Sequence, residues 1–93
     1  MRTVLRPTPD GQMTGLVLTI GLDRITAPPA ARPLDAAHIV ALARGQRADT
    51  RPVIVRLLPH TRPQLFELLG GHDRYIAAQL RRDPAIECQV LPP

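Results

Sequence analysis

The residues with the clearest chemical potential form one continuous stretch near the middle of the second half of the chain. They follow the apolar run 64–69 and precede a pattern of helical spacing. A helix that begins after two glycines presents unpaired backbone N–H groups at a positively polarised end, and the glycines let a ligand approach the backbone. The same stretch is equally readable as a plain strand-to-helix turn, with its Asp complementing the helix dipole and its Arg paired to a nearby acid. The candidate ligand-binding residues are Gly70, Gly71, His72, Asp73, Arg74 and Tyr75.

Three further residues of reactive types offer less. His38 and His60 have no Cys or His at metal-ligand spacing, so we predict no metal site and expect both to be solvated or capping residues. Cys88 alternates with Ile86 and Val90 in a strand pattern and is expected to be a small core residue. A lone cysteine cannot form an internal disulfide. We therefore assign no catalytic residue from the sequence.

The composition limits the classes of function. The chain has 93 residues, enough for one domain, and all 12 basic residues are Arg. The absence of Lys excludes a Walker-type phosphate loop and Schiff-base chemistry. The net charge is modest, 12 − 8 = +4. Phe66 and Tyr75 are the only aromatic residues, which argues against nucleic-acid binding by base stacking.

The length of the apolar runs and the residues at the start of the chain indicate where in the cell the protein is expected. No apolar run approaches the ~20 residues that cross a bilayer, and residues 1–15 contain no signal-peptide core. We expect a cytoplasmic protein with no membrane association.

Prolines, glycines and hydrophobic spacing predict the order of the elements. Residues 1–14 are expected to form an N-terminal arm or the first limb of a hairpin, and residues 15–93 the domain itself. The predicted elements, in order, are a strand at 16–22, an extended crossing loop at 27–33, a helix between Asp35 and Gly45, strands at 52–58 and 64–69, a helix from His72, and a strand at 86–91. This order predicts a small α/β (α+β) domain with a mixed β-sheet and two main helices.

Helical spacing also predicts which faces are buried. Asp35 is the expected N-cap of the first helix and Gly45 its C-terminal stop. The predicted buried face of the first helix comprises Ala36, Ile39, Leu42 and Ala43. The predicted buried face of the second comprises Ile76, Ala77 and Leu80.

The strand–glycine–helix stretch resembles the signature of the superfamily that contains ParB N-terminal domains and sulfiredoxins. ParB domains carry G-E-R-R-x-R-A there, sulfiredoxins G-G-C-H-R-Y, and a branch of ParB-like serine kinases D-G-H-H-R. The segments 22–25 and 32–33 are similar to the family's first strand and its P-x-R box, and 52–56 to its P-I-x-V-R strand. The likeness covers residues 15–91 and implies the ParB/sulfiredoxin-like fold.

Departures from that signature shape the expected function. In ParB domains the arginines of the motif face the phosphates of CTP, but here two of those positions are Asp73 and Ile76, and an Asp repels a triphosphate. The sulfiredoxin thiolate position is His72, and Cys88 cannot replace it because it belongs to the last predicted strand, on the face shared by Ile86 and Val90. The sequence thus favours a degenerate nucleotide site and a protein without catalysis, although it leaves the question of enzymatic activity open.

The resulting expectation is a non-catalytic ParB-like binding module that recognises a peptide or protein partner, as an accessory protein of a biosynthetic pathway. It needs no cofactor. The alternatives are a switch or phosphotransferase that binds CTP or ATP with Mg²⁺, and an accessory DNA-binding protein. The arginines near the helix ends would serve the latter, but the chain given ends at Pro93 without a DNA-binding domain, so DNA binding alone is not favoured. A homodimer is a further arrangement that the sequence leaves open.

Overall fold

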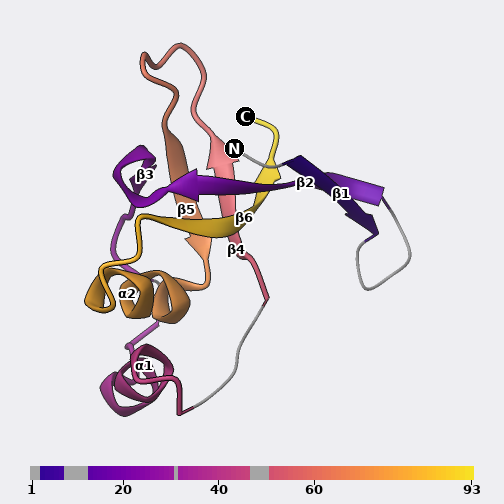
Figure 1. Cartoon of the computed structure of the whole chain (residues 1–93). Helices are drawn as coiled ribbons and strands as arrows, with labels where there is room; N and C mark the ends of the chain where they lie inside the picture. The colour runs from indigo at the N-terminus through magenta and orange to yellow at the C-terminus, as the bar shows by residue number, and fades with distance from the viewer. Residues whose placement is uncertain (1–2, 8–12, 31, 47–50) are drawn as a thin grey trace.

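The computed structural model describes residues 3–7, 13–30, 32–46 and 51–93. In these residues six strands form one sheet, and two α-helices lie on one side of it (Figure 1). Residues 1–2 and 8–12 of the predicted arm or hairpin limb lie outside the described residues. The elements are β1 (Thr3–Pro7), β2 (Met13–Gly21), a 3-10 turn η1 (Leu22–Arg24), β3 (Ile25–Thr26), α1 (Ala36–Ala43), β4 (Val53–Leu57), β5 (Phe66–Gly70), α2 (His72–Leu80) and β6 (Ala85–Leu91).

The sheet is mixed and its strands are ordered β1-β2-β6-β4-β5-β3. The pairs β1/β2, β2/β6 and β4/β5 are antiparallel, whereas β4/β6 and β3/β5 are parallel. β3 pairs with β5 only through Phe66 and Glu67. The predicted fold class, a small mixed sheet with two main helices, is therefore confirmed.

The molecule is layered as sheet, α2 and then α1 (Figure 1). The main core lies between the sheet and α2, where Tyr75 joins aliphatic side chains from the strands and Cys88. A smaller cluster of Ile39, Leu42 and Ala77 holds α1 on the far side of α2. Because α1 packs chiefly on α2, it forms a separate wall beside the N-terminus of α2.

Capping residues fix the bounds of α1 as the sequence predicts. The Asp35 side chain accepts a hydrogen bond from the His38 backbone N–H at 3.1 Å, which satisfies one of the unpaired donors of the first turn. At the other end, Gly45 has φ 71° and its N–H donates to the Leu42 carbonyl, while the Gln46 N–H donates to that of Ala41. These two bonds make a Schellman C-cap, which calls for a left-handed residue at Gly45.

The same C-cap ends α2, but with a non-glycine residue in the left-handed position. The Arg82 N–H donates to the Gln79 carbonyl and the Asp83 N–H to that of Ala78, both at 3.0 Å. Arg82 has φ 59°, a conformation that crowds a Cβ against the backbone. No feature of the sequence signalled this strain.

Several local expectations need correction. β3 was not among the predicted strands, whereas the antiparallel pairing of β1 with β2 agrees with the hairpin alternative expected for the start of the chain. Two residues that were expected on the buried faces of the helices are exposed: Ala36 in α1 and Leu80, at 59%, in α2. The buried positions of α2 are Tyr75, Ala77 and Ala78. Ala77 is therefore buried as predicted and Ile76 packs against both clusters, whereas Leu80 was wrongly expected to be buried.

Candidate functional site

Gly70 and Gly71 connect β5 to α2 and have different roles. Gly70 is the last residue of β5 and pairs with Ile54, so the predicted break of the strand falls one residue later. Gly71 is the N-cap of α2 with φ 82° and ψ 31°. A Cβ at this position would lie 2.8 Å from Arg74 Nη2 and 2.9 Å from Val53 Cγ1. Gly71 is thus required both by its backbone conformation and by lack of space.

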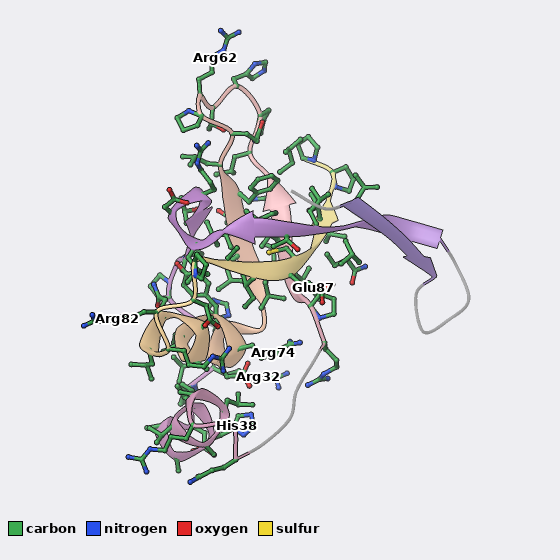
Figure 2. All side chains as sticks on the ribbon, viewed as in Figure 1. Arg32, His38, Arg62, Arg74, Arg82 and Glu87 are labelled. Atoms are coloured by element: carbon green, nitrogen blue, oxygen red, sulfur yellow. The ribbon has the colours of Figure 1, made fainter. Side chains whose placement is uncertain are left out.

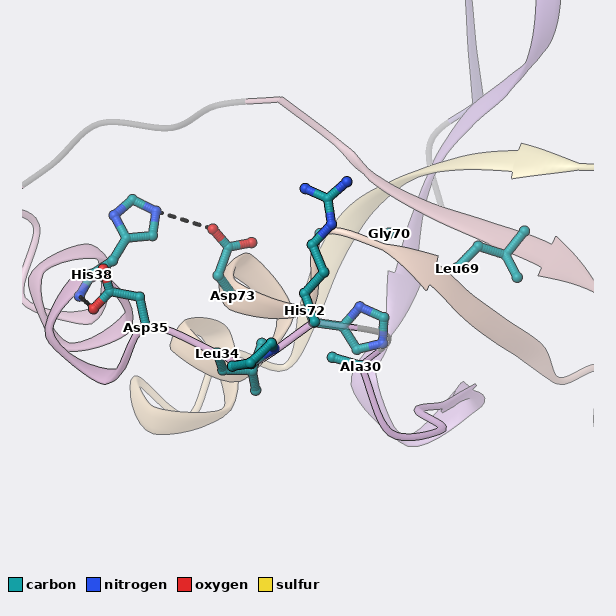
Figure 3. Close-up of a pocket in the computed structure, with 11 residues that line it drawn as sticks. Ala30, Leu34, Asp35, His38, Leu69, Gly70, His72 and Asp73 are labelled. Atoms are coloured by element: carbon teal, nitrogen blue, oxygen red, sulfur yellow. Dashed lines mark hydrogen bonds and ion pairs between the residues drawn. The ribbon is translucent and has the colours of Figure 1, made fainter.

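A cavity of about 500 Å³ opens between this corner and the chain that leads into α1 (Figure 3). Figure 3 shows Leu69 at one end of it and His38 at the other. The lining residues combine aliphatic and polar side chains: Ala30, Arg32, Pro33, Leu34, Asp35, His38, Leu69, Gly70, Gly71, His72 and Asp73. Such a mixture of apolar walls with a few polar groups is typical of a binding site.

His38 and Asp73 face each other across one wall of the cavity, from α1 and α2 respectively (Figure 3). His38 Nε2 lies 3.0 Å from Asp73 Oδ2, and both side chains are about 30% exposed, at 28% and 31%. Asp73 Oδ1 also accepts a hydrogen bond from the Arg74 backbone N–H at 2.9 Å. The expectation that His38 is a solvated or capping residue is therefore wrong for its side chain, because the packing of α1 on α2 brings it to Asp73.

The Arg74 side chain is turned toward the main chain that enters β4. Its Nη1 donates hydrogen bonds to the carbonyl oxygens of Arg51, at 2.7 Å, and Pro52, at 3.1 Å. The side chain is 14% exposed, and it is not among those that line the cavity. Its Nε lies 3.9 Å from Asp73 Oδ1. Arg74 thus ties the first turn of α2 to the start of β4.

The other predicted site residues also differ in whether they line the cavity. Tyr75 is 6% exposed and belongs to the core, where its hydroxyl accepts a hydrogen bond from Gln79 Nε2 at 3.2 Å. His72 lines the cavity, and its Nε2 lies 3.3 Å from the Pro28 carbonyl oxygen. Of the six candidates, the cavity brings together Gly70, Gly71, His72 and Asp73.

Cys88 and His60 lie away from the cavity. Cys88 is fully buried, as predicted, and burial together with the charge of Glu87 raises the pKa of its thiol from 9.0 to about 12. His60 is exposed in the loop between β4 and β5, with φ 62°. Within the described residues, no group of three His, Cys, Asp or Glu side chains is arranged to hold a metal ion.

A second cavity of about 500 Å³ lies at the other end of the core face and contains none of the predicted site residues. Its lining residues are Ile20, Gly21, Asp23, Arg24, Gln64 and Phe66. The Gln64 amide nitrogen is occupied by the loop itself, through hydrogen bonds to the carbonyls of Leu58 and Leu65. This cavity is therefore built around loop-stabilising contacts.

Seven of the residues that line the first cavity were not among the predicted site residues, and they include Arg32, Leu34, His38 and Leu69. Leu34 and Leu69 are aliphatic side chains in segments expected to be a loop and a strand, and their 45% and 43% exposure depends on what packs beside them. Arg32 stood out only through the family's P-x-R box. No pattern of neighbouring residues in the sequence places these side chains in one cavity with Gly70 and Gly71.

The fold is ParB/sulfiredoxin-like, as the solved structures that it resembles make plain. The crystal structure of sulfiredoxin from Arabidopsis thaliana matches with a TM-score of 0.67 and 22% identity, over 83% of this chain and 85% of that one. C-terminally truncated ParB from Caulobacter crescentus, complexed with CTP-gamma-S, matches with a TM-score of 0.68 and 17% identity, over 83% of this chain. The same ParB complexed to the centromeric parS site matches with a TM-score of 0.61 and 19% identity, over 78% of this chain.

The chain spans 44% and 37% of the two ParB structures. No protein-family profile matches the chain, and neither does any curated protein. The likeness thus establishes the fold, and function has to be argued from the cavity. Among the residues described, none of the helices has the length and apolar character to cross a membrane.

Proposed function

We propose that this chain is a non-catalytic binding module that holds an extended segment of a peptide or protein partner in the cavity that residues 30 and 32–35 form with residues 69–73. The observation that carries the proposal is the exposure of two leucines, from two different segments, that line one cavity. Leu34 is 45% exposed and Leu69 43% exposed, and both line it. Covering each half-exposed leucine with an aliphatic side chain contributes about 1 kcal/mol to binding.

The edge of the sheet beside the cavity supports an extended ligand. Since β3 pairs with Phe66 and Glu67 alone, the segment Leu68–Gly70 of β5 has β4 on one side and no described strand on the other. Leu69 and Gly70, in this segment, line the cavity. A strand edge of this kind accepts an extended chain by main-chain hydrogen bonding, while the cavity receives its side chains.

The polar groups of the cavity support binding without chemistry on a nucleotide. Arg74, the residue that the family resemblance assigns to phosphate, is occupied by two backbone carbonyls. Asp73 lies at the N-terminus of α2 and places a carboxylate where a triphosphate would need cations. This donor set does not fit CTP or ATP with Mg²⁺.

The arginines also give little support to DNA binding as the function. Arg56 pairs with Glu67 at 2.6 Å, and Arg81 pairs with Asp83 at 2.9 Å, so each is neutralised locally. Arg81 Nη1 also donates to the Leu42 carbonyl, which ties the end of α2 to α1. Arg47, part of the basic group near the helix ends, lies outside the described residues.

A displayed library of random peptides tests the proposal. Peptides selected on the protein are titrated by calorimetry against the double variant Leu34→Ser/Leu69→Ser and against Leu80→Ser. Leu80 is 59% exposed and does not line the cavity, so it is a matched control. Loss of about 2 kcal/mol at the two leucines weakens binding roughly 30-fold, whereas Leu80→Ser leaves it unchanged.

Nucleotides provide the opposing arm of the test. CTP, ATP and ADP, each with Mg²⁺, are screened by thermal shift, and we expect no stabilisation. A rise of several degrees with any one of them would overturn the proposal, because a ligand that binds the folded state raises its melting temperature. The same proposal includes an accessory role in a biosynthetic pathway. A protein of such a pathway that contains the selected peptide sequence would support this role.

A further inference from the structure

The charged residues that line the cavity differ in whether they already have partners. Asp35 accepts a hydrogen bond from the His38 backbone N–H, and Asp73 contacts both the His38 ring and the Arg74 backbone N–H. Arg32, in contrast, has no hydrogen bond or ion pair to any residue in the described part of the chain. It is exposed, and its guanidinium carries five donors in a fixed planar fork.

The formal charge of the residues that line the cavity is negative, which by itself would disfavour an acidic ligand. With both histidines neutral, Arg32 contributes +1 and the two Asp residues −2, a sum of −1. Each carboxylate, however, lies at the N-terminus of a helix, where the dipole supplies roughly half a positive charge and the backbone donates hydrogen bonds. The two carboxylates are therefore partly compensated within the fold, whereas the charge of Arg32 has no partner among the described residues.

We propose that the segment bound in the cavity carries an Asp or Glu side chain that pairs with Arg32, within two residues of the aliphatic side chain that covers Leu34 or Leu69. The inference rests on the proposed function, because it specifies the chemistry of the same ligand. Arg32 precedes Leu34 by two residues and lines the same cavity, so an acidic and an aliphatic group of one extended segment can reach both. Bidentate pairing of guanidinium with carboxylate supplies the specificity.

Charge reversal tests this selection directly. A random peptide library is selected in parallel on the wild-type protein, on Arg32→Glu and on the matched control Arg62→Glu. Arg62 is exposed and projects from the loop between β4 and β5, far from α1 and α2 (Figure 2). We expect Asp or Glu beside an aliphatic residue on the wild type and on Arg62→Glu, and Lys or Arg at the same position on Arg32→Glu.

Titration of the selected peptides adds a quantitative readout. Replacing the acidic residue of a selected peptide by its amide should weaken binding to the wild type about 5- to 10-fold and leave binding to an Arg32→Gln variant unchanged. Added salt should weaken the acidic peptide more than the amide peptide.

The outcomes separate this inference from the proposed function. Peptides that lose affinity with Leu34→Ser/Leu69→Ser but show no acidic preference would overturn the role of Arg32 and leave the binding module standing. Enrichment of basic residues on the wild type would assign recognition to Asp35 and Asp73 and would likewise overturn it. If no peptide is selected at all, both proposals fail together.

Discussion

The tight fit at Gly71 makes a sharp prediction, because a second glycine serves as its control. Gly71 and Gly45 both have left-handed backbones, with φ 82° and 71°. A Cβ at Gly71 would meet Arg74 Nη2 at 2.8 Å and Val53 Cγ1 at 2.9 Å, whereas one at Gly45 has nothing within 4 Å. Alanine at Gly45 should therefore cost only the backbone strain, about 1–2 kcal/mol.

At Gly71 a second cost is added. Val53 is fully buried and cannot move away, so the Arg74 side chain has to shift, and its hydrogen bonds to the main chain before β4 are distorted. Loss of a hydrogen bond from a charged donor costs about 1.5–3 kcal/mol. The free energy of unfolding should fall by about 2.5–5 kcal/mol for Gly71→Ala, the sum of the two costs. A chain of this length has roughly 5–14 kcal/mol in total, so the variant keeps a folded state over most of that range.

Urea denaturation followed by far-UV circular dichroism measures both variants, since the chain has no Trp. Asparagine separates the two costs, because it tolerates the left-handed region but carries the same Cβ. Gly45→Asn should recover most of the stability lost in Gly45→Ala, and Gly71→Asn should not recover that lost in Gly71→Ala. Equal costs for alanine at the two positions would refute the reasoning and show that the space around Gly71 relaxes freely.

Three other predictions concern single side chains. Arg82→Gly should raise the free energy of unfolding by about 1 kcal/mol, because the side chain projects into solvent (Figure 2) and φ is 59°; an unchanged urea midpoint would contradict the strain. Cys88 should react with an aromatic disulfide reagent at pH 8 about 10³-fold more slowly than a thiol of pKa 9.0, since burial raises its pKa to about 12. Reaction at the rate of a free thiol in the absence of urea would refute its burial. By the same shift, stability should hold below pH 9 and fall as pH rises from 9 toward 12, a loss that Cys88→Ala abolishes. A double-mutant cycle with His38→Ala and Asp73→Asn should give a coupling of about 0.2–1 kcal/mol, as for partly exposed pairs, and a coupling of zero would refute a role for this contact in holding α1 on α2, leaving packing and the hydrogen bond from Arg81 to the Leu42 carbonyl.

The elements that the sequence predicted well are those with local physical signals. Asp35 caps α1 because its carboxylate reaches a backbone N–H three residues away, and Gly45 ends the helix because a left-handed residue is needed there. Cys88 is buried because alternation in β6 places it on the core face. In each of these cases the interaction that decides the structure spans only a few residues.

The contacts that shape the cavity have no such local signal. His38 meets Asp73 across 35 positions, and the contact depends on how α1 packs on α2. The partners of Arg74 are backbone carbonyls, which every residue possesses, so no residue type in the sequence marks them. Leu34 and Leu69 look like ordinary core residues until the packing leaves them exposed.

At the turn from β5 to α2, Gly71 and Arg74 both have structural roles in the fold. Gly71 supplies the left-handed N-cap and the room for a guanidinium, and Arg74 places that guanidinium on the carbonyls that lead into β4. A likeness in this stretch can therefore persist without phosphate binding, because the same two residues join β5, α2 and β4. Under the proposed function, specificity would come from the cavity walls beside Gly70 and Gly71, where the exposed side chains include Arg32, Leu34 and Leu69.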